Sequence, residues 1–354
     1  MYRFMLCSLK TGRVLYEMPF TIAGSLSRLL QGFGTGTLAL PIHDPACSST
    51  WAQDVLPWRS VILVVDEHNR ILWHGIPINR LRSGNGIVRY PCVTIEGYLL
   101  RRYTPNLMFE AVDQTAIAAA LAGVAADAVG IPLTIDAPAS RVIRDRVYAD
   151  DENARLYSRL QELAAVDNGF NWTMDVTWTN TDQTSVRYVF RTGYPHLGNR
   201  TSTPEHVFEL PGNVTDFEFD ERWGDGDAAT HARAFGDGDS EAKVMSKPVV
   251  DTVREAAGWP RLEERRSFSG VTEQHTIDAH AARLGRQLFA GQELITLAVR
   301  EDAGTRLGDL HLGDTARVSI STPDVDLDAV WVVTEWSLTQ DATTYSPTLA
   351  RLEA

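Results

Sequence analysis

Residues 168–178 read Asn-Gly-Phe-Asn-Trp-Thr-Met-Asp-Val-Thr-Trp, and they contain the clearest strand pattern in the chain. From Phe170 to Trp178, apolar and polar residues alternate without a break. A period of two places the two sets of side chains on opposite faces, so this segment predicts a strand with one buried and one wet face. A polar turn over 180–185 leads to a second apolar run over 186–190, which predicts an antiparallel hairpin.

Two helices are predicted before this hairpin. Apolar residues recur at helical spacing over 113–128, with Asp113 as the expected N-cap, Gly130 at the expected end and Pro132 barring continuation. A second helix is predicted over about 151–166, capped by Asp150 or Asp151, with one apolar face made of Leu156, Leu160 and Leu163.

Strands dominate both ends of the chain. Near the N-terminus, an antiparallel meander of four or five strands is predicted from runs over 32–40, 60–65, 70–75, 76–81 and 87–100. Phe217 and Phe219 alternate with acids in a further strand, and a third helix is predicted from near Thr272. The last strands are predicted over 294–299, 315–320 and 330–338. This order favours an α+β fold in which strands dominate.

Composition limits the class of protein. The 354 residues predict two or three domains, and no apolar run approaches the roughly 20 residues of a membrane-spanning helix. We expect no secretory signal, because the N-terminus turns polar by Lys10. The net charge of −13 argues against a grip on nucleic-acid phosphates. Cys7, Cys47 and Cys92 form no CxxC pair, so we expect free, buried or half-buried thiols.

Glycine and histidine patterns indicate no ligand site. Gly32, Gly34 and Gly36 form G-x-G-x-G before a predicted strand, whereas a dinucleotide site needs G-x-G-x-x-G between a strand and a helix. We therefore expect a glycine-rich strand or bulge. His275 and His280 lie five apart on the third predicted helix, about 140° around its axis. They cannot share a metal ion as an i, i+4 pair would.

The stretch 216–241 is the strongest remaining candidate for a site. It holds nine acids against Arg222 and Arg233, a net charge of −7, and Gly-Asp-Gly-Asp occurs at 224–227 and 236–239. Neither copy has Gly at position six and Glu at position twelve of a calcium loop, so we expect solvated turns and leave a metal ion open. We name no catalytic, cofactor-binding or metal-ligating residue, although a pair among the 46 acids could converge for hydrolysis. The nine acids are Asp216, Glu218, Asp220, Glu221, Asp225, Asp227, Asp237, Asp239 and Glu241.

Six segments carry a family resemblance: 38–44 (LALPIHD), 73–75 (WHG), 96–103 (EGYLLRRY), 168–172 (NGFNW), 258–263 (GWPRLE) and 307–314 (LGDLHLGD). Together with the order of the elements, they resemble the tail hub proteins of long-tailed bacteriophages. The similarity is greatest to minor tail proteins of phages that infect actinobacteria. It covers most of the chain, and it brings no catalytic residue with it.

The resemblance implies a homotrimer at the tail tip, a location in the virion, and assembly in the host cytoplasm. Two tail-tube-like β-barrel domains per subunit would form a pseudo-six-fold ring. The implied partners are the distal tail protein, the tail tube or tape-measure protein, and tail fibre or spike proteins. Genomic DNA would pass without specific binding, because an acidic lumen repels phosphates. The resemblance implies neither a membrane span nor a cofactor.

We accordingly predict four parts: a β-barrel-like domain over 1–108, a mixed α/β domain over 109–215, an acidic strand and loop segment with a connecting helix over 216–289, and a second barrel-like domain over 290–354. The second barrel could recruit strands near Asp216.

Two alternatives to a structural, non-enzymatic hub stay open. One is a tail-tip hydrolase acting on the host cell wall, although the chain stops at Ala354 just after its last predicted strand. The other is a carbohydrate-binding module. It would use exposed tryptophans among Trp51, Trp58, Trp178 and Trp223. Trp172 and Trp178 lie on the apolar face of an alternating strand, where packing in the core is the expected role.

Overall fold

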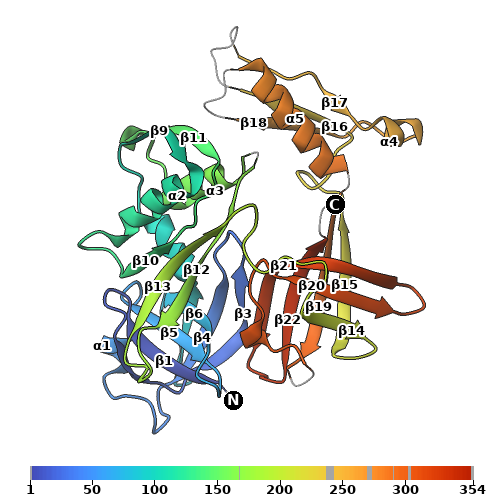
Figure 1. The fold of residues 1–354 in the computed structure, drawn as a ribbon. Coiled ribbons are helices and arrows are strands. Elements are labelled where there is room, and N and C mark those ends of the chain that lie inside the picture. Colours follow the sequence, from blue (N-terminus) through green and yellow to red (C-terminus); the bar gives the residue numbers. More distant parts are fainter. Residues whose placement is uncertain are drawn as a thin grey trace. The chain divides into compact units, whose positions relative to one another are not determined.

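The chain folds into two compact units (Figure 1). Residues 1–217 and 297–349 make up unit 1, and residues 218–296 and 350–354 make up unit 2. Strands dominate, which confirms the β-rich α+β class. None of the helices in the described residues is long and apolar enough to cross a membrane. The computed structural model describes residues 2–166, 168–236, 243–268, 273–289, 291–301 and 304–351.

One large sheet joins strands from both ends of the chain. Its order is β15-β19-β22-β21-β3-β4-β8-β6-β5-β1-β2, β20 and β14 branch from β21, and β7 pairs with β8. β3 and β21 are antiparallel, with Leu26 opposite Leu338. The described strands follow this open path and form no closed barrel. Their bounds are Arg3–Ser8 (β1), Val14–Glu17 (β2), Thr21–Leu29 (β3), Thr35–Pro41 (β4), Ser60–Val65 (β5), Ile71–Pro77 (β6), Leu81–Arg82 (β7), Ile87–Val93 (β8), His206–Leu210 (β14), Val214–Arg222 (β15), Gln292–Arg300 (β19), Thr315–Ser321 (β20), Asp326–Thr339 (β21) and Thr344–Arg351 (β22).

The expected glycine-rich strand is confirmed at β4. A Cβ on Gly34 would lie 1.8 Å from the carbonyl oxygen of Ser27, and one on Gly36 would lie 2.2 Å from Leu26 Cδ2. The β3–β4 register shifts between Ile22 and Leu26, as it does at a bulge. The two glycines therefore allow the strands to approach closely.

The predicted strand over 87–100 is wrong in its second half. β8 ends at Val93, and Ile95–Arg101 forms a 3₁₀ helix (η1). Thr94 ends the strand because its hydroxyl accepts a hydrogen bond from the backbone N–H of Gly34, and its own N–H donates to the carbonyl of Gly34. A short helix also lies at Trp51–Asp54 (α1).

The hairpin predicted over 170–190 is confirmed. β12 (Asn171–Trp178) pairs antiparallel with β13 (Val186–Gly193), and β10 (Leu133–Asp136) adds to β13 in parallel. Trp172 and Met174 are fully buried, as the alternation predicts. Trp172 packs against Phe190 and Tyr157, with ring centroids 5.9 Å away in each case.

The two predicted helices exist with shorter bounds. α2 spans Gln114–Gly123 and is capped by the Asp113 carboxylate, and a 3₁₀ turn follows at Val124–Ala126 (η2). The second helix, α3 (Leu156–Ala164), begins later than predicted. Asp150 and Asp151 lie instead in a 3₁₀ turn, Asp150–Glu152 (η3), after which Asn153 is left-handed and breaks the helix. The ribbon of β9 (Leu107–Asp113) and β11 (Ile143–Tyr148) was not predicted.

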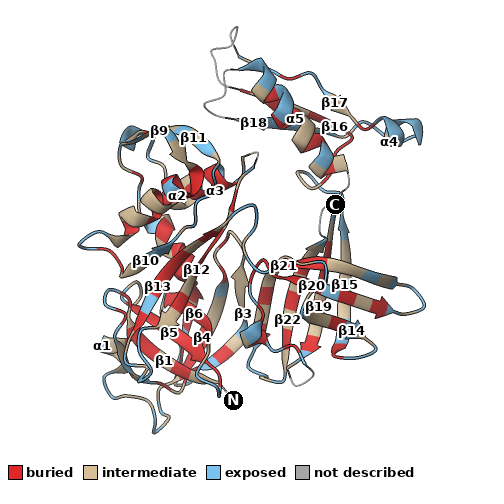
Figure 2. Cartoon of the chain, in the orientation of Figure 1, coloured by how far each residue is buried: buried red, intermediate tan, exposed pale blue. Residues whose placement is uncertain are grey.

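A single hydrophobic cluster connects the first strands to the helices and the hairpin. It extends from Val61 and Leu63 in β5 to Leu121 in α2, Leu160 in α3 and Phe190 in β13 (Figure 2). The expected free thiols are confirmed, since Cys7 and Cys92 are buried and Cys47 is half-buried. This cluster positions η1 and β12 beside β3.

Unit 2 holds a small sheet in the order β17-β16-β18. Its strands are Val249–Val250 (β17), His231–Phe235 (β16) and Glu263–Ser267 (β18), and its helices are Thr252–Ala256 (α4) and Gln274–Phe289 (α5). The described part of the predicted third helix is confirmed as α5, which packs its Ile277, Ala281 and Leu284 on the sheet.

Candidate functional site

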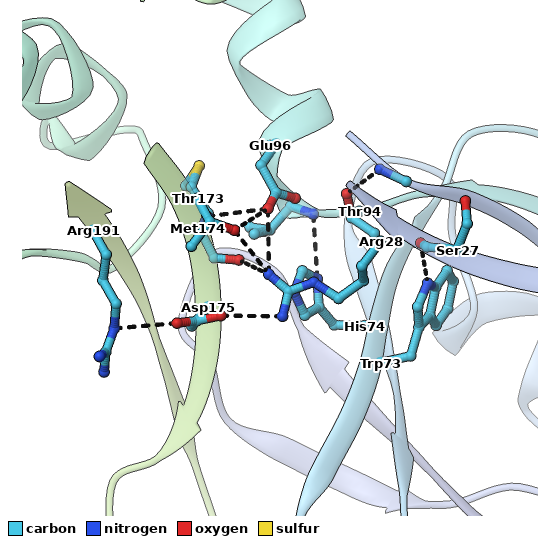
Figure 3. Close-up of polar contacts among 12 residues, drawn as sticks. Ser27, Arg28, Trp73, His74, Thr94, Glu96, Thr173, Met174, Asp175 and Arg191 are labelled. Carbon is cyan, nitrogen blue, oxygen red and sulfur yellow. Dashed lines mark hydrogen bonds and ion pairs between the residues drawn. The ribbon is translucent and has the colours of Figure 1, made fainter. Parts of the chain in front are cut away.

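A buried ion pair joins β3 to η1 in unit 1 (Figure 3). The side chains of Arg28 in β3 and Glu96 in η1 are 11% and 1% exposed. Arg28 Nη2 lies 3.5 Å from Glu96 Oε1, and Arg28 Nη1 lies 3.1 Å from Asp175 Oδ1 in β12. The same guanidinium donates to Thr173 Oγ1 at 3.2 Å and to the carbonyl oxygen of Met174 at 2.8 Å. One arginine thus holds together three segments distant in sequence.

Glu96 is held in place by hydrogen bonds to one of its oxygens. Its Oε1 accepts from the backbone N–H of Met174 at 3.0 Å and from the Thr173 hydroxyl at 3.4 Å. Burial raises the pKa of Glu96 above its ordinary value, and the positive charge of Arg28 acts against that rise. Burial alone would lower the pKa of Arg28, but Asp175 and Glu96 raise it. Each charge therefore depends on the other.

His74 in β6 lies against the same pair. It is buried, and its Nδ1 accepts from the backbone N–H of Ile95 at 3.3 Å. Burial, and then the charge of Arg28, hold the pKa of His74 well below its ordinary value, so the imidazole is neutral at pH 7. The neighbour of Arg28 is thus an uncharged ring.

The ion pair continues toward the surface as a chain of alternating charges. Arg191 Nε in β13 lies 3.1 Å from Asp175 Oδ2, and Arg191 Nη1 lies 3.8 Å from Asp136 Oδ2. The exposed fraction rises from 11% at Arg28 to 26% at Asp175 and 42% at Arg191. Exposed pairs contribute little, whereas removing one partner of the buried pair of Arg28 and Glu96 would leave an uncompensated buried charge.

A cavity of about 430 Å³ lies beside this network, within unit 1. Its volume falls in the range of small-molecule sites. Arg28, His74 and Asp175 line one side, and the loop around η4 (Leu307–Asp309) lines another with Leu310. In the part of the chain that the structure describes, no three His, Cys, Asp or Glu side chains are grouped to hold a metal ion.

Asp314 at the rim of this cavity joins three segments. Its Oδ1 accepts from the backbone N–H of Asn199 at 2.6 Å, and its Oδ2 accepts from the backbone N–H of His311 at 2.9 Å. The rings of His206 and His311 each approach Oδ2 to 3.5 Å. Burial alone would raise the pKa of Asp314, but these hydrogen bonds hold it well below its ordinary value. The hydrogen bond to Asp314 raises the pKa of His311.

Both clusters are compensated from within. Arg28 and backbone or hydroxyl donors reach Glu96 Oε1, whereas Glu96 Oε2 is buried without a hydrogen-bond partner among the described residues. Arg28 and Arg191 hold Asp175, and two histidines and two N–H groups hold Asp314. Ion-pair networks of this kind perturb pKa values without catalysis. The first cluster fixes β3, η1 and β12 to one another, and the second fixes the loop before β20 to Asn199 and to His206 of β14.

The sequence-predicted candidates are not brought to this site. His280 is buried and stacks on Phe268 with ring centroids 4.2 Å apart, whereas His275 is exposed on α5. Of the acidic stretch, the first four acids lie on β15 and the next two in the turn after it. Asp237, Asp239 and Glu241 lie outside the described residues.

The four candidate tryptophans each have a partner within the chain. Arg80 and Arg82 lie 5.6 and 5.2 Å from the ring centroid of Trp51, and Arg101 lies 5.3 Å from that of Trp58. Trp178 donates from Nε1 to the carbonyl oxygen of Asn69 at 2.8 Å. The ring of Trp223 lies 4.9 Å from that of Trp259.

No sequence motif indicated Arg28, Glu96 or Asp314. A charged residue inside an otherwise apolar run is the one signal that could have found Glu96, which follows Cys92, Val93 and Ile95. Its partner cannot be found in this way, because Arg28 lies 68 positions away.

Comparisons with known proteins identify the fold. No family model matches the chain, and no curated protein matches its sequence. Among solved structures, it is similar to a tail protein from Neisseria meningitidis, with a TM-score of 0.61 and 12% identity over 99% of this chain and 96% of that one. The 43 kDa tail protein of prophage MuSo2 from Shewanella oneidensis has a TM-score of 0.60 and 12% identity, over 99% of this chain and 97% of that one. A prophage tail protein from Listeria monocytogenes has a TM-score of 0.53 and 12% identity, over 99% of this chain and 94% of that one. The chain therefore has the fold of phage tail proteins.

Proposed function

We propose that this chain is a structural tail hub of a bacteriophage and works at the tail tip of the virion. The observation that carries the proposal is the fold, which the prophage tail proteins from Shewanella and Listeria share over 99% of the chain. Because the six segments are most similar to tail proteins of phages that infect actinobacteria, we propose such a phage as the source of this chain.

In this proposal the hub is a homotrimer. Strands from the two ends of each subunit act as two tail-tube-like modules, so three subunits present six modules to a six-fold ring. The partners are the distal tail protein, the tail tube or tape-measure protein, and tail fibre or spike proteins. The four-part division at residues 108, 215 and 289 belongs to this proposal. The pairing of β3 with β21 supports it, because it links the first and last strand groups rigidly.

We propose further that the hub forms a channel through which DNA passes without specific binding, and that it is not an enzyme. The net charge of −13 supports passage, because an acidic wall repels phosphates. The internal compensation of Glu96, Asp175 and Asp314 supports a structural role for the charged clusters.

Stoichiometry tests the proposal directly. Native mass spectrometry of the purified chain is expected to give three copies per complex, alone or with a distal tail ring. Cryo-electron microscopy of a tail tip with this subunit tagged is expected to place three tags around the tail axis. The hub proposal would be refuted by a stoichiometry that no three-fold arrangement can produce, or by tags that lie along the tail shaft.

A further inference from the structure

The small sheet of unit 2 has one covered face and one open face (Figure 1). Ala232 and Ala234 of β16 are buried under α5. The alternate residues of β16, which are His231, Arg233 and Phe235, point to the opposite face and are half-buried. β18 pairs in parallel with β16 and lies at the edge of the sheet among the described strands.

The open face gathers positive charge in an acidic protein. Arg233 of β16 lies directly beside Arg265 of β18 in the strand register. Like charges on adjacent strands destabilise a sheet, so this pair has a cost in the free chain. Lys243 adds a further cation, with Nζ 5.7 Å from the ring centroid of Phe235, and Arg233 Cζ lies 5.3 Å from the same ring.

One carboxylate serves the arginines of this face. Glu263 Oε1 lies 2.5 Å from Arg261 Nη2, and Glu263 Oε2 lies 3.3 Å from Arg265 Nη2. Arg233 donates instead to the carbonyl oxygen of Ser246 at 2.9 Å. Two of the four cations, Arg261 and Arg265, therefore share one carboxylate. The two arginines that pair with Glu263 are 60% and 59% exposed and can reach a ligand.

A small hollow lies between these side chains. Its volume of about 30 Å³ is close to that of one liquid water molecule, which is enough to seat a carboxylate oxygen. Arg233, Arg261 and Arg265 line it together with two carboxylates, Glu263 and Glu264.

We propose that the basic face of unit 2, made of Arg233, Lys243, Arg261 and Arg265, binds an acidic segment of a partner protein in extended conformation. Arginine pairs with carboxylates through two parallel N–H···O bonds. Alternate residues of an extended peptide are about 6.6 Å apart, as are alternate residues of a strand. A peptide along the edge of β18 can thus present a carboxylate to each exposed arginine and form backbone hydrogen bonds with the strand.

Charge complementarity favours this occupant over two alternative roles for the basic face. Charges on an edge strand can prevent its pairing with other chains. That role does not require two arginines side by side. A nucleic acid is also a polyanion, but it has no peptide backbone that could form strand-like hydrogen bonds along the edge of β18. The inference does not depend on the hub proposal, since it concerns the contacts of one subunit.

Fluorescence anisotropy with the full chain tests the inference. The probe is a labelled oligoglutamate peptide, and an oligolysine peptide and a single-stranded oligonucleotide are the comparison ligands. We expect saturable binding of oligoglutamate that weakens as salt is added, and weaker binding of both comparison ligands. No saturable binding of oligoglutamate, or tighter binding of the oligonucleotide, would overturn the proposal.

A matched pair of variants locates the site. Arg265→Gln is expected to weaken oligoglutamate binding roughly tenfold, whereas Arg266→Gln changes the neighbouring residue on the opposite face and is expected to leave it unchanged. Arg266 pairs there with Glu264 at 3.3 Å. The melting temperature of Arg265→Gln should not fall, because the change relieves its repulsion with Arg233. Equal weakening by both variants would contradict the site, and Arg261→Gln repeats the test if Arg265→Gln folds poorly.

Discussion

Replacing Arg28 by methionine is expected to leave the carboxylate of Glu96 buried without its cation. Removing one partner of a buried ion pair costs about 3–5 kcal/mol. The expected value is at the low end, about 3 kcal/mol, because Glu96 keeps the N–H of Met174 at 3.0 Å and Asp175 keeps Arg191 at 3.1 Å. For a unit of this size, that corresponds to a loss of roughly 6–12 °C in melting temperature.

The double variant Arg28→Met/Glu96→Gln separates charge from packing. A neutral amide at Glu96 needs no cation, so stability is expected to return to within about 1 kcal/mol of the parent. Hydrogen exchange measured by mass spectrometry is the suitable assay, because peptides from β3 and β12 report on this joint alone. The single variant should lose protection there, and the double variant should regain it.

The stability deficit of Arg28→Met is also expected to depend on pH. Burial raises the pKa of Glu96, and the variant lacks the charge that opposes this rise. A group with a raised pKa binds its proton more tightly in the folded state than in the unfolded state. Its contribution to stability is therefore present at pH values below its ordinary pKa, and it is lost as the pH rises through its pKa in the folded state. The deficit relative to the parent should therefore be full at pH 8 and shrink toward pH 5. A deficit below 1 kcal/mol, or one that does not change with pH, would refute the reasoning.

Other clusters and the fold give further predictions. In Asp314→Asn, the NMR titration midpoint of His311 should fall, because the hydrogen bond that raises its pKa is removed; an unchanged midpoint would contradict this. Asp113→Ala should cost about 1–2 kcal/mol in denaturant unfolding through loss of the α2 cap. Burial acts to raise the pKa of Asp113, but hydrogen bonds lower it to about 2. The parent should therefore lose the stability of this cap as the pH falls from the ordinary pKa of an aspartate toward 2, and the variant should not. Gly34→Ala should fail to give soluble, folded protein, since its Cβ would lie 1.8 Å from the backbone carbonyl oxygen of Ser27; a normal melting curve would show that β3 and the start of β4 can separate. A zymogram on host peptidoglycan should show no clearing, and clearing would establish a hydrolase.

The sequence predicted the elements in which the alternation or helical spacing of apolar residues is unbroken. β12 was found because its alternate residues enter one core without interruption. β1 and β3 were missed because each contains an irregularity. The register of β1 shifts between Leu6 and Cys7, and β3 contains Gly24 with φ of 96°. A bulge moves the following side chains to the other face, so alternation disappears although the strand continues.

The candidate site could not be predicted for a different reason. Arg28 is separated by 68 positions from Glu96 and by 147 from Asp175, and no local period links such residues. Sequence patterns report on faces and turns within one element. A buried ion pair is a property of how separate elements pack, so it becomes visible only once their arrangement is known.

Some residues at these joints nevertheless lie in the segments that carry the family resemblance, although Arg28 and Asp175 lie outside all six. His74, Glu96 and Asp314 fall within 73–75, 96–103 and 307–314. Those segments hold β6, η1 and the loop before β20 against their neighbours, so the resemblance reflects how the elements are fixed to one another. Of the six segments, 258–263 alone reaches the basic face of unit 2, which we propose as a partner-binding surface.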